Sequence, residues 1–216
     1  MNQQPALLPV TQATRQQLRR TFRAKRQALT PLQQTQASEG LLNTLITHSV
    51  LDSVHHLALY LPNDGELDPT RLIHYAWQNG INTYLPVLHP FHKKSLLFVA
   101  YTADTLMHAN KFGIPEPQIE CLNIYPAQQL DLILTPLVAF DAAGNRMGMG
   151  GGFYDRTLAP IYAQNPQFQD NHPRLIGVAH DCQEMDNVPT ESWDIPLQAI
   201  LTPTRAIEGS QHLNDV

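Results

Sequence analysis

The segment LILTPLVAFDAAGNRMGMGGGFYDRTL, residues 132–158, decides the fold of this chain of 216 residues. Its first residues belong to DLILT, Asp131 to Thr135, which has the apolar composition of a strand buried on both faces of a sheet. A glycine-rich loop follows, and residues from Phe153 to about Ala163 are predicted to be helical. A strand joined to a helix by such a loop is typical of a parallel α/β sheet.

The flanking sequence repeats this alternation of helices and strands. Helices are predicted from Thr11 to Leu29, from Thr30 and Pro31 to near His48, and from Asp68 and Pro69 to Gly80. Strands are predicted at 54–61, 81–87, 95–101, 174–180 and 197–202. The pattern predicts an α/β fold with a largely parallel central sheet. We expect one domain over 1–216, with 1–10 and 205–216 as flexible tails.

Composition excludes several classes of protein. The formal net charge of −5 argues against a nucleic-acid-binding surface, and no apolar stretch has the roughly 18 residues that a membrane helix needs. The N-terminal residues do not have the pattern of a secretory signal. Cys121 and Cys182 are far apart and match no metal spacing. We therefore expect a monomeric cytoplasmic protein with small-molecule partners and neither nucleic acid nor membrane.

The glycine-rich loop has the chemistry of an anion-binding site. Four of the eleven glycines fall within positions 148–152, where the lack of a Cβ lets backbone N–H groups turn toward an anion. The following helix would present its positive end, and Arg146 and Arg156 would add charge in a geometry that suits phosphate. Asp155 offers carboxylate oxygens to Mg²⁺. Composition alone fits a tight strand-to-helix connection equally well, and the loop is neither a Walker A loop nor a dinucleotide fingerprint.

The order of several short motifs decides between these readings. In the glycine-rich segment, AFD and GNRMGMGGGFYDR resemble the signature of the 5-formyltetrahydrofolate cyclo-ligases, also called methenyltetrahydrofolate synthetases. The motifs RQQLRRTFRAKRQAL, YLPNDGELDP, YLPVL, GIPEP, PTESWDIPL and ILTP occur in that family's order, from about Arg15 to Pro203. The resemblance covers nearly the full chain. It implies a three-layer sandwich of the sugar-phosphate isomerase and CoA-transferase type.

The resemblance also implies a reaction. Enzymes of this family convert 5-formyltetrahydrofolate and ATP to 5,10-methenyltetrahydrofolate, ADP and phosphate, with Mg²⁺. An N-formyl carbon is a poor electrophile, so transfer of the γ-phosphoryl group to the formyl oxygen activates it. The second folate nitrogen, already tethered nearby, then closes the ring. The protein would align the reacting groups and neutralise charge during transfer.

By the same resemblance, the glycine loop and the basic N-terminal helix would bind ATP. Arg15 and Arg19 lie one helical turn apart and match the family's ATP-binding pair, with Arg15 in place of the usual lysine. Catalytic roles fall on Arg146, Tyr154 and Asp155, and Mg²⁺ would be bound by Asp155 and Asp194. The residues expected to bind ATP are Arg15, Arg19, Arg146, Met147, Gly148, Met149, Gly150, Gly151, Gly152, Phe153 and Tyr154.

The implied folate pocket is built around Glu66, whose carboxylate can accept hydrogen bonds from the amino and ring N–H groups of a pterin. Apolar contact would come from the end of the strand before it, and an aromatic residue ahead of GIPEP would cover the folate. The residues expected to bind this substrate are Tyr60, Leu61, Glu66, Phe112, Met149, Gly150, Gly151, Gly152 and Phe153.

Each assignment has a purely structural alternative. Glu66, Asp155 and Asp194 can stabilise turns or helix ends. Phe112 can be an ordinary core residue. For most of the other basic residues in the N-terminal helix, a solvated helix face is the preferred interpretation: Arg20, Arg23, Lys25 and Arg26.

The ten histidines form no recognisable metal or acid–base motif. His55 and His56 are adjacent on a predicted strand and so point to opposite faces, and His89 and His92 flank a proline-containing loop. The AHDC motif at 179–182 lacks a nucleophile elbow. We interpret these histidines as core, loop or surface residues. Two rival functions are a phosphosugar isomerase or CoA-transferase that needs no ATP, and a folate- or nucleotide-binding regulator without turnover.

Overall fold

The computed structural model describes residues 12–163 and 172–209. Within these residues, the helices are α1 (Gln12–Gln27), α2 (Pro31–Thr47), α3 (Thr70–Gln78) and α4 (Phe153–Ala163). The strands are β1 (His56–Ala58), β2 (Asn82–Leu88), β3 (Leu96–Tyr101), β4 (Met107–Ala109), β5 (Pro115–Pro117), β6 (Ile124–Tyr125), β7 (Leu132–Pro136), β8 (Ala139–Phe140), β9 (Arg146–Met147), β10 (Arg174–Val178), β11 (Ala199–Leu201) and β12 (Ala206–Glu208). Short 3₁₀ helices lie at Ala127–Gln129 and Asp181–Gln183.

A large sheet forms the centre of the molecule, with the strand order β12-β11-β10-β7-β1-β2-β3-β6. The inner strands β11, β10, β7, β1 and β2 pair in parallel, whereas β12, β3 and β6 add antiparallel pairs at the two edges. The predicted α/β class with a mostly parallel sheet is confirmed. Because the inner strands are parallel, their carboxyl ends meet at one edge of the sheet, where α/β proteins place their ligand sites.

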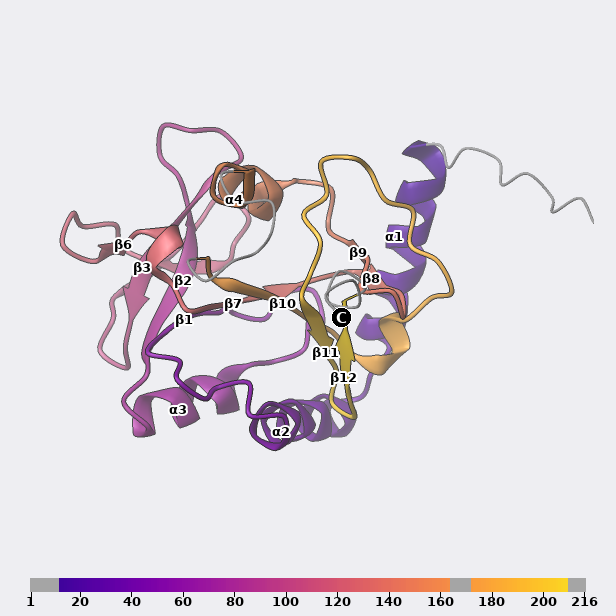
Figure 1. Cartoon of the computed structure of the whole chain (residues 1–216), viewed down its shortest axis with the longest axis horizontal. Coiled ribbons are helices and arrows are strands. Elements are labelled where there is room, and N and C mark those ends of the chain that lie inside the picture. Colours follow the sequence, from indigo (N-terminus) through magenta and orange to yellow (C-terminus); the bar gives the residue numbers. More distant parts are fainter. Residues whose placement is uncertain (1–11, 164–171, 210–216) are drawn as a thin grey trace, which may run out of the picture.

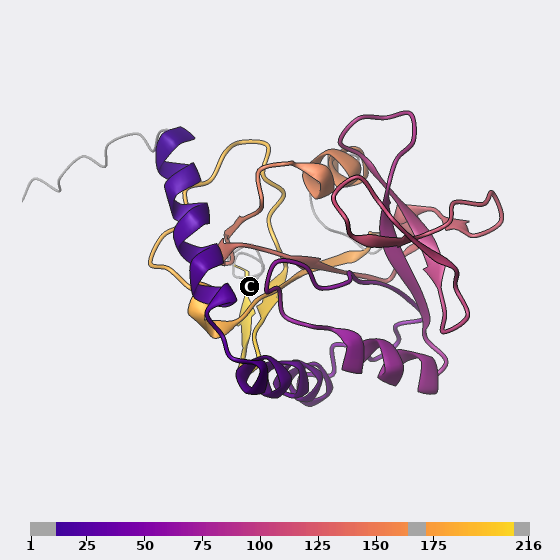
Figure 2. The same ribbon diagram turned by 180° about the vertical axis from the view of Figure 1, so that it is seen from behind.

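Helices cover both faces of this sheet (Figures 1 and 2). Helices α2 and α3 lie against one face and α4 lies on the other, which gives three layers. Helix α1 stands at one end of the molecule beside the short β8–β9 hairpin. The chain therefore brings its N-terminal helix next to the start of the glycine-rich segment.

Two apolar cores separate the layers. One packs α2 and α3 onto the sheet through residues such as Leu41, Leu45 and Leu72, and the other lies on the α4 side and includes Phe98 and Leu158. The apolar spacing in α2 predicts that Leu41, Leu42, Leu45 and Ile46 face the core. Leu41 and Leu45 are fully buried and Leu42 is partly buried, but Ile46 is 46% exposed, so the prediction is wrong for Ile46. A smaller cluster packs α1 onto β8 and β9 around Phe22, Ala139 and Met147.

The predicted helix boundaries have the expected local chemistry. The Thr30 side chain accepts a hydrogen bond from the Gln33 N–H, the Gln33 side chain accepts one from the Thr30 N–H, and Pro31 occupies the first turn of α2. Gly80 follows α3 with φ 71°, a left-handed conformation that glycine adopts without strain. Both helices therefore begin and end where the sequence predicts.

The strands depart from the prediction in two ways. The strand predicted at 54–61 shrinks to His56–Ala58, because the chain then turns away toward Asp64 and Gly65, both with positive φ. The short antiparallel strands β4, β5, β6, β8 and β9 were not predicted, since two or three residues carry no measurable alternation of apolar and polar side chains. Their pairing depends on partners brought together by the fold.

The predicted C-terminal tail also differs from the structure. Within 205–216, Ala206–Glu208 pairs with β11 as the edge strand β12 rather than lying free. Ile207 sits opposite Ile200 in this pairing, so an apolar contact accompanies the hydrogen bonds. Residues 210–216 and the predicted N-terminal tail 1–10 lie outside the described residues.

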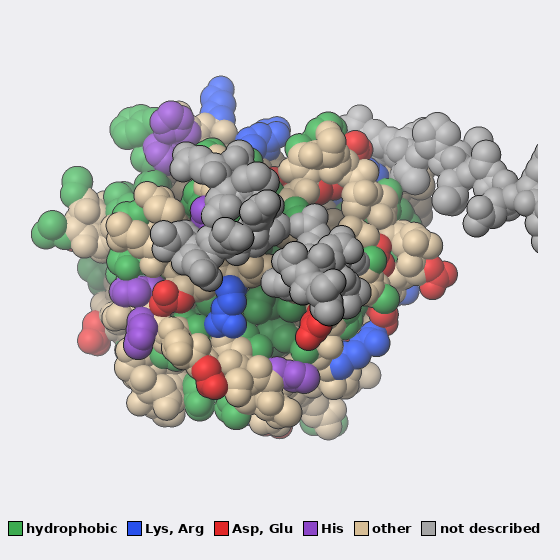
Figure 3. Space-filling model, in the orientation of Figure 1, with side chains coloured by type: hydrophobic (Ala, Val, Ile, Leu, Met, Phe, Trp, Pro, Cys, Tyr) green, Lys and Arg blue, Asp and Glu red, His purple; other side chains and the backbone are tan. Residues whose placement is uncertain are grey.

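On the face drawn in Figure 3, basic and acidic side chains are interspersed rather than gathered by sign. Among the described residues, no helix combines the length and apolar character needed to cross a membrane.

Candidate active site

The glycine-rich segment lies at the carboxyl edge of the parallel strands. After β7 ends at Pro136, the chain forms the β8–β9 hairpin, passes through 148–152 and enters α4 at Phe153. The hairpin turn is held by Asp141, a buried carboxylate that accepts hydrogen bonds from the backbone N–H groups of Ala143 and Asn145 and from Val188. The loop therefore begins after a hydrogen-bonded turn and ends at the N-terminus of α4, which is the positive end of the helix dipole.

Two of the loop glycines adopt conformations that other residues avoid. Gly150 has φ 93° and Gly152 has φ 64°. A Cβ at Gly150 would lie 3.2 Å from Cζ of Arg19, and a Cβ at Gly152 would lie 2.6 Å from Nη1 of Arg156. Glycine is thus favoured at both positions by the positive φ, while the flexible arginine side chains could move to make room for a Cβ.

These arginines bind the carbonyl groups of the loop. Arg19 Nε donates to Gly148 O at 2.8 Å, and Arg156 Nη1 donates to Gly151 O at 2.6 Å. Burial lowers the pKa of Arg19, and the neighbouring positive charge of Arg15 acts in the same direction. The structure therefore brings the predicted ATP-binding residue Arg19 of α1 onto the predicted phosphate loop.

Arg146 lies beneath the loop rather than on its surface. It is buried, its Nη2 donates to Asp155 Oδ1 at 2.5 Å, and its Nη1 donates to the carbonyl of Ile195. Burial lowers the pKa of Arg146, while Asp155 and Asp194 act to raise it, so both carboxylates are near its guanidinium. Arg146 thus ties the start of α4 to the 194–196 segment.

The two predicted metal ligands already have cationic neighbours. Asp194 lies 3.5 Å from Arg15 Nη2 and accepts a backbone hydrogen bond from Glu191 at 2.9 Å, while Asp155 is bonded to Arg146. No group of three or more histidine, cysteine or acidic side chains that could hold a metal occurs among the described residues. Carboxylate oxygens still fit Mg²⁺, which commonly takes one or two of them and completes its shell with water and phosphate.

Glu66 lies near Tyr154 in the first turn of α4. Its Oε2 accepts a hydrogen bond from Asn63 N at 3.1 Å. Burial raises the pKa of Glu66 to about 7, although the neighbouring Arg26 acts to lower it. A carboxyl group with a pKa near neutrality, mostly removed from water, is typical of a functional site.

Two tyrosines flank this carboxyl group. Burial, followed by the negative charge of Glu66, raises the pKa of both Tyr60 and Tyr154. Tyr60 donates its hydroxyl to Leu67 O at 2.6 Å, and Tyr154 hydrogen-bonds the Thr135 side chain in β7. Glu66 and Tyr60, from one stretch after β1, are therefore brought close to Tyr154 of α4.

One pair of the predicted folate-binding aromatic residues meets at the start of α4. Phe112 meets Phe153 edge-on, with ring centroids 6.4 Å apart and an interplanar angle of 85°. Phe112 is 57% exposed and Met149 is 51% exposed, so neither belongs to the core. Core packing, the alternative for Phe112, is wrong, and Leu61 is half-buried beside the α2–α3 core.

The solvated-face interpretation is wrong for Arg26, which is 0% exposed. Arg23 keeps 39% of its side chain exposed and binds Asp64 through Nε at 2.6 Å. Arg20 and Lys25 are exposed, as expected. The signal for Arg26 was present, because it lies four residues after Phe22 and seven after Arg19 and so shares their helix face.

The histidines lie away from this constellation or inside the core. His56 Nδ1 lies 2.8 Å from the Tyr84 hydroxyl, and the rings of His89 and His92 meet edge-on. His180 is buried, which lowers its pKa to about 4. The interpretation of these residues as core, loop or surface side chains agrees with their surroundings.

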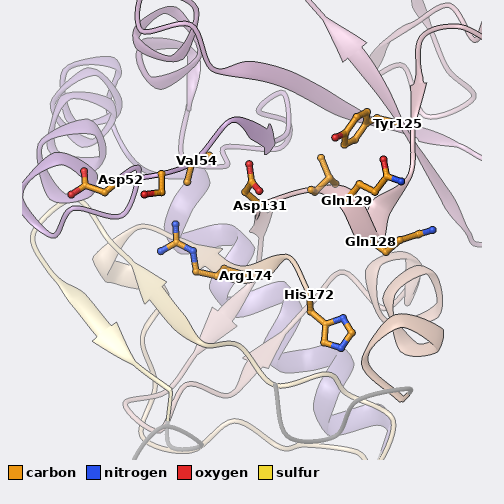
Figure 4. Close-up of a pocket in the computed structure, with 10 residues that line it drawn as sticks. Asp52, Val54, Tyr125, Gln128, Gln129, Asp131, His172 and Arg174 are labelled. Carbon is orange, nitrogen blue, oxygen red and sulfur yellow. The ribbon is translucent and has the colours of Figure 1, made fainter. Parts of the chain in front are cut away.

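A hollow of about 540 Å³ lies elsewhere (Figure 4). Its lining includes Val54, Asp131 and Arg174, which precede or begin β1, β7 and β10. Asp131 accepts hydrogen bonds from the N–H groups of His55 and His56, so it organises the strand starts. This hollow is at the amino edge of the parallel strands, opposite the glycine loop, and is not the candidate active site.

The parallel sheet, with a glycine loop and arginines at its carboxyl edge, places this chain among the α/β proteins, whose ligand sites commonly lie at that edge. A family model, that of the 5-formyltetrahydrofolate cyclo-ligase family, matches residues 11–203. The chain belongs to this family of enzymes.

Individual relatives agree with this assignment. The chain is 47% identical over 187 residues to the 5-formyltetrahydrofolate cyclo-ligase of Haemophilus influenzae, covering 87% of this chain and 96% of that protein. It is 44% identical to the protein of the same name from Escherichia coli K12, covering 87% and 99%. The solved structure of Aquifex aeolicus 5,10-methenyltetrahydrofolate synthetase superposes with a TM-score of 0.75 at 26% identity, covering 94% of each chain. The Mycoplasma pneumoniae synthetase has a TM-score of 0.66 at 23% identity, covers 88% of this chain and 98% of its own, and shares the fold.

Proposed function

We propose that this enzyme converts 5-formyltetrahydrofolate and ATP to 5,10-methenyltetrahydrofolate, ADP and phosphate. The observation that carries the proposal is the convergence of two kinds of chemistry on one loop. Arg19 binds the loop carbonyl of Gly148 at 2.8 Å, and the helix that the loop opens carries Tyr154, whose pKa responds to Glu66. An anion-binding loop therefore borders a carboxyl group suited to a pterin.

The loop and α1 would bind the nucleotide. The N–H groups of 148–152 and of the first turn of α4 would donate to phosphate oxygens, and Arg19 and Arg15 would approach from α1. Arg15 is mostly buried and lies 3.4 Å from Glu191 and 3.5 Å from Asp194, so its role includes holding the segment that carries Asp194. These contacts would fix the γ-phosphate in one place, which is the main task in phosphoryl transfer.

Asp155 and Asp194 would hold Mg²⁺ together with the nucleotide phosphates. When bound, this ion would neutralise charge on the transferring phosphoryl group. Arg146 hydrogen-bonds Asp155 and interacts electrostatically with Asp194, so it would orient Asp155 and limit the repulsion between the two carboxylates. Its contribution to catalysis would be made through Asp155 rather than by direct contact with phosphate.

Glu66 would bind the pterin through its amino and ring N–H groups, while Phe112, Phe153 and Met149 would cover the folate by apolar contact. The formyl oxygen would attack the γ-phosphorus and ADP would leave. The second folate nitrogen would then attack the activated carbon, lose its proton, and displace phosphate. The fixed pterin would keep this nitrogen near the carbon throughout.

Other features belong to the same proposal. We propose a single domain over 1–216 with the strand arrangement of the sugar-phosphate isomerase and CoA-transferase class. We also propose a monomer in the cytoplasm; the free thiols of Cys121 and Cys182 fit a reducing compartment. A non-catalytic regulator is disfavoured because Glu66, Asp155 and the glycine loop are all intact.

The test is a spectroscopic assay for the methenyl product. Purified protein is mixed with 5-formyltetrahydrofolate, with and without ATP and Mg²⁺, and ADP is measured in parallel. We expect product only when both are present, with one ADP formed for each methenyl group. Protein that is inert toward the formylated folate at saturating ATP and Mg²⁺ would rule out the proposal.

A further inference from the structure

Arg26 is a fully buried cation at the end of α1. It is 0% exposed, and its guanidinium donates to Asp64 O at 2.9 Å, Leu137 O at 3.1 Å and Asp64 Oδ2 at 2.8 Å. Burying a guanidinium is costly unless its N–H groups are paired in this way. Three directed bonds therefore fix the guanidinium between α1, the turn at Asp64 and the segment after β7.

The same guanidinium faces the carboxyl group of the proposed folate pocket. Arg26 Nη2 lies 2.8 Å from Asp64 Oδ2 and 3.6 Å from Glu66 Oε1. Asp64 has a second cationic partner, because Arg23 binds both of its carboxylate oxygens at 2.6 and 3.0 Å. Arg23 thus compensates much of the charge of Asp64, which leaves Arg26 able to act on Glu66 as well.

The backbone between these two acids is shaped to make the contact. Asp64 and Gly65 have φ values of 54° and 74°, so the turn is left-handed at two successive residues. A Cβ at Gly65 would lie 3.3 Å from the carbonyl oxygen of Arg26. The turn is therefore pressed against the last turn of α1, and Arg26 is the side chain that fastens it there.

We propose that Arg26 is a positioning residue of the active site: it fixes the turn that carries Glu66 and keeps the Glu66 carboxylate charged as the pterin binds. This inference rests on the proposed function for the identity of the ligand. It assigns a role to a residue that touches neither substrate, and its geometry is independent of any ligand.

Opposing effects act on the ionisation of Glu66, and Arg26 is one of those that favour the charged form. Arg26 and Arg23 from α1 favour the anion, and burial and Asp64 favour the neutral acid. Tyr60 and Tyr154 face it as neutral phenols, because burial raises the pKa of each. His180 lies near Arg26 but stays neutral, since burial lowers its pKa to about 4. The outcome of this balance is a pKa for Glu66 of about 7.

A group that titrates at the working pH is sensitive to its neighbours. Loss of a cation within ~4 to 6 Å commonly moves a carboxyl pKa by about one unit or more. If the pKa of Glu66 rose by about one unit, the ionised fraction at neutral pH would fall roughly fivefold. Binding of a pterin through its N–H groups requires the ionised form, so affinity would fall in proportion.

The experiment measures the Glu66 carboxyl directly. Its ¹³C signal, assigned with Glu66→Gln, is followed against pH in the ligand-free protein and in three variants. Arg26→Gln should raise the midpoint by about one pH unit. Asp64→Asn should lower it, because a neighbouring negative charge is removed. Arg20→Gln, which alters an exposed arginine of the same helix, is the control and should leave it in place.

Folate binding is then measured against pH in the same proteins, and its midpoint should move with that of the carboxyl group. Arg26→Lys keeps the positive charge but not the planar guanidinium, so its midpoint should return most of the way to the wild-type value. A residue that only packs the helix would lower affinity equally at every pH, and a folded Arg26→Gln protein with an unmoved midpoint would refute the inference. Should that variant not fold, Asp64→Asn decides alone, since a raised or unchanged midpoint there contradicts the proposal. If the Glu66 midpoints move as expected but the protein binds no folate, the proposed function is wrong. The action of Arg26 on Glu66 would still stand.

Discussion

Replacing Glu66 with glutamine should stabilise the ligand-free protein above neutral pH. In the folded chain the pKa of Glu66 is raised from 4.5 to about 7, chiefly by burial. The folded state therefore holds a proton that the unfolded chain releases between these two pH values. Stability associated with the neutral acid is fully present below pH 4.5 and is lost as pH rises through about 7.

The magnitude follows from the size of the shift. Each pKa unit corresponds to about 1.4 kcal/mol, so a rise from 4.5 to about 7 corresponds to about 3 kcal/mol above neutrality. Glutamine keeps an acceptor for the Asn63 N–H but weakens the contact with Arg26, which offsets about 1 kcal/mol of the gain. The net stabilisation should be about 1 to 3 kcal/mol at pH 8.5 and close to zero at pH 4.5.

Urea unfolding at both pH values measures this difference, with equal m-values confirming that the same transition is compared. The control is Glu39→Gln, which removes a surface carboxylate that is 52% exposed and pairs with Arg71 at 2.7 Å. It should show no comparable dependence on pH. A Glu66→Gln effect that is the same at pH 4.5 and pH 8.5 would refute the reasoning. The substitution should also weaken folate binding more than ATP binding, so stability would be gained at the expense of function.

Three further substitutions test the rest of the site. Asp155→Asn should reduce Mg²⁺-dependent turnover at least about 100-fold with the circular dichroism spectrum retained; an unchanged rate would remove Asp155 from the metal site. Gly150→Ala should destabilise the loop by about 1 to 3 kcal/mol and raise the KM for ATP, because the backbone there has φ 93°. Gly148→Ala, where no atom lies within 4 Å of the added Cβ, should cost clearly less, and equal losses would count against this strain argument. Phe112→Ala should raise the Kd for folate about tenfold without lowering the unfolding midpoint, since the ring is 57% exposed and contacts Phe153; an unfolding midpoint that fell instead would mark Phe112 as structural.

The sequence predicted those parts of the fold that depend on local chemistry. Thr30 and Pro31 start α2 and Gly80 ends α3, because capping and turn conformations are decided within a few residues. The long apolar strands were recognised for the same reason. The β4–β5 and β8–β9 pairs and the edge strand β12 were not, since strands of two or three residues are stabilised by partners that only the folded chain supplies.

For the site, one contiguous string was enough to find the glycine loop and the residues that follow it. The proximity of Glu66 to Tyr154 could not be read from spacing, because it depends on how β1, β7 and α4 assemble around the sheet. Arg26 was misjudged because a charged residue near a helix end is ordinarily exposed. The helix face that it shares with Phe22 indicates burial, but the hydrogen-bond acceptors that make burial possible, Asp64 and the Leu137 carbonyl, come from distant parts of the chain.

The guanidinium groups of Arg19 and Arg156 already have partners in the carbonyls of Gly148 and Gly151. A phosphate that recruits either arginine must therefore compete with a bond the protein makes to itself, and the net gain is the difference between the two. Each exchange also releases a peptide oxygen, which must be rehydrated or bonded anew. The measured affinity for the proposed nucleotide should therefore be lower than the arginine–phosphate contacts alone would give. The order in which Arg19 and Arg156 release their carbonyl partners would determine how the loop binds the phosphates.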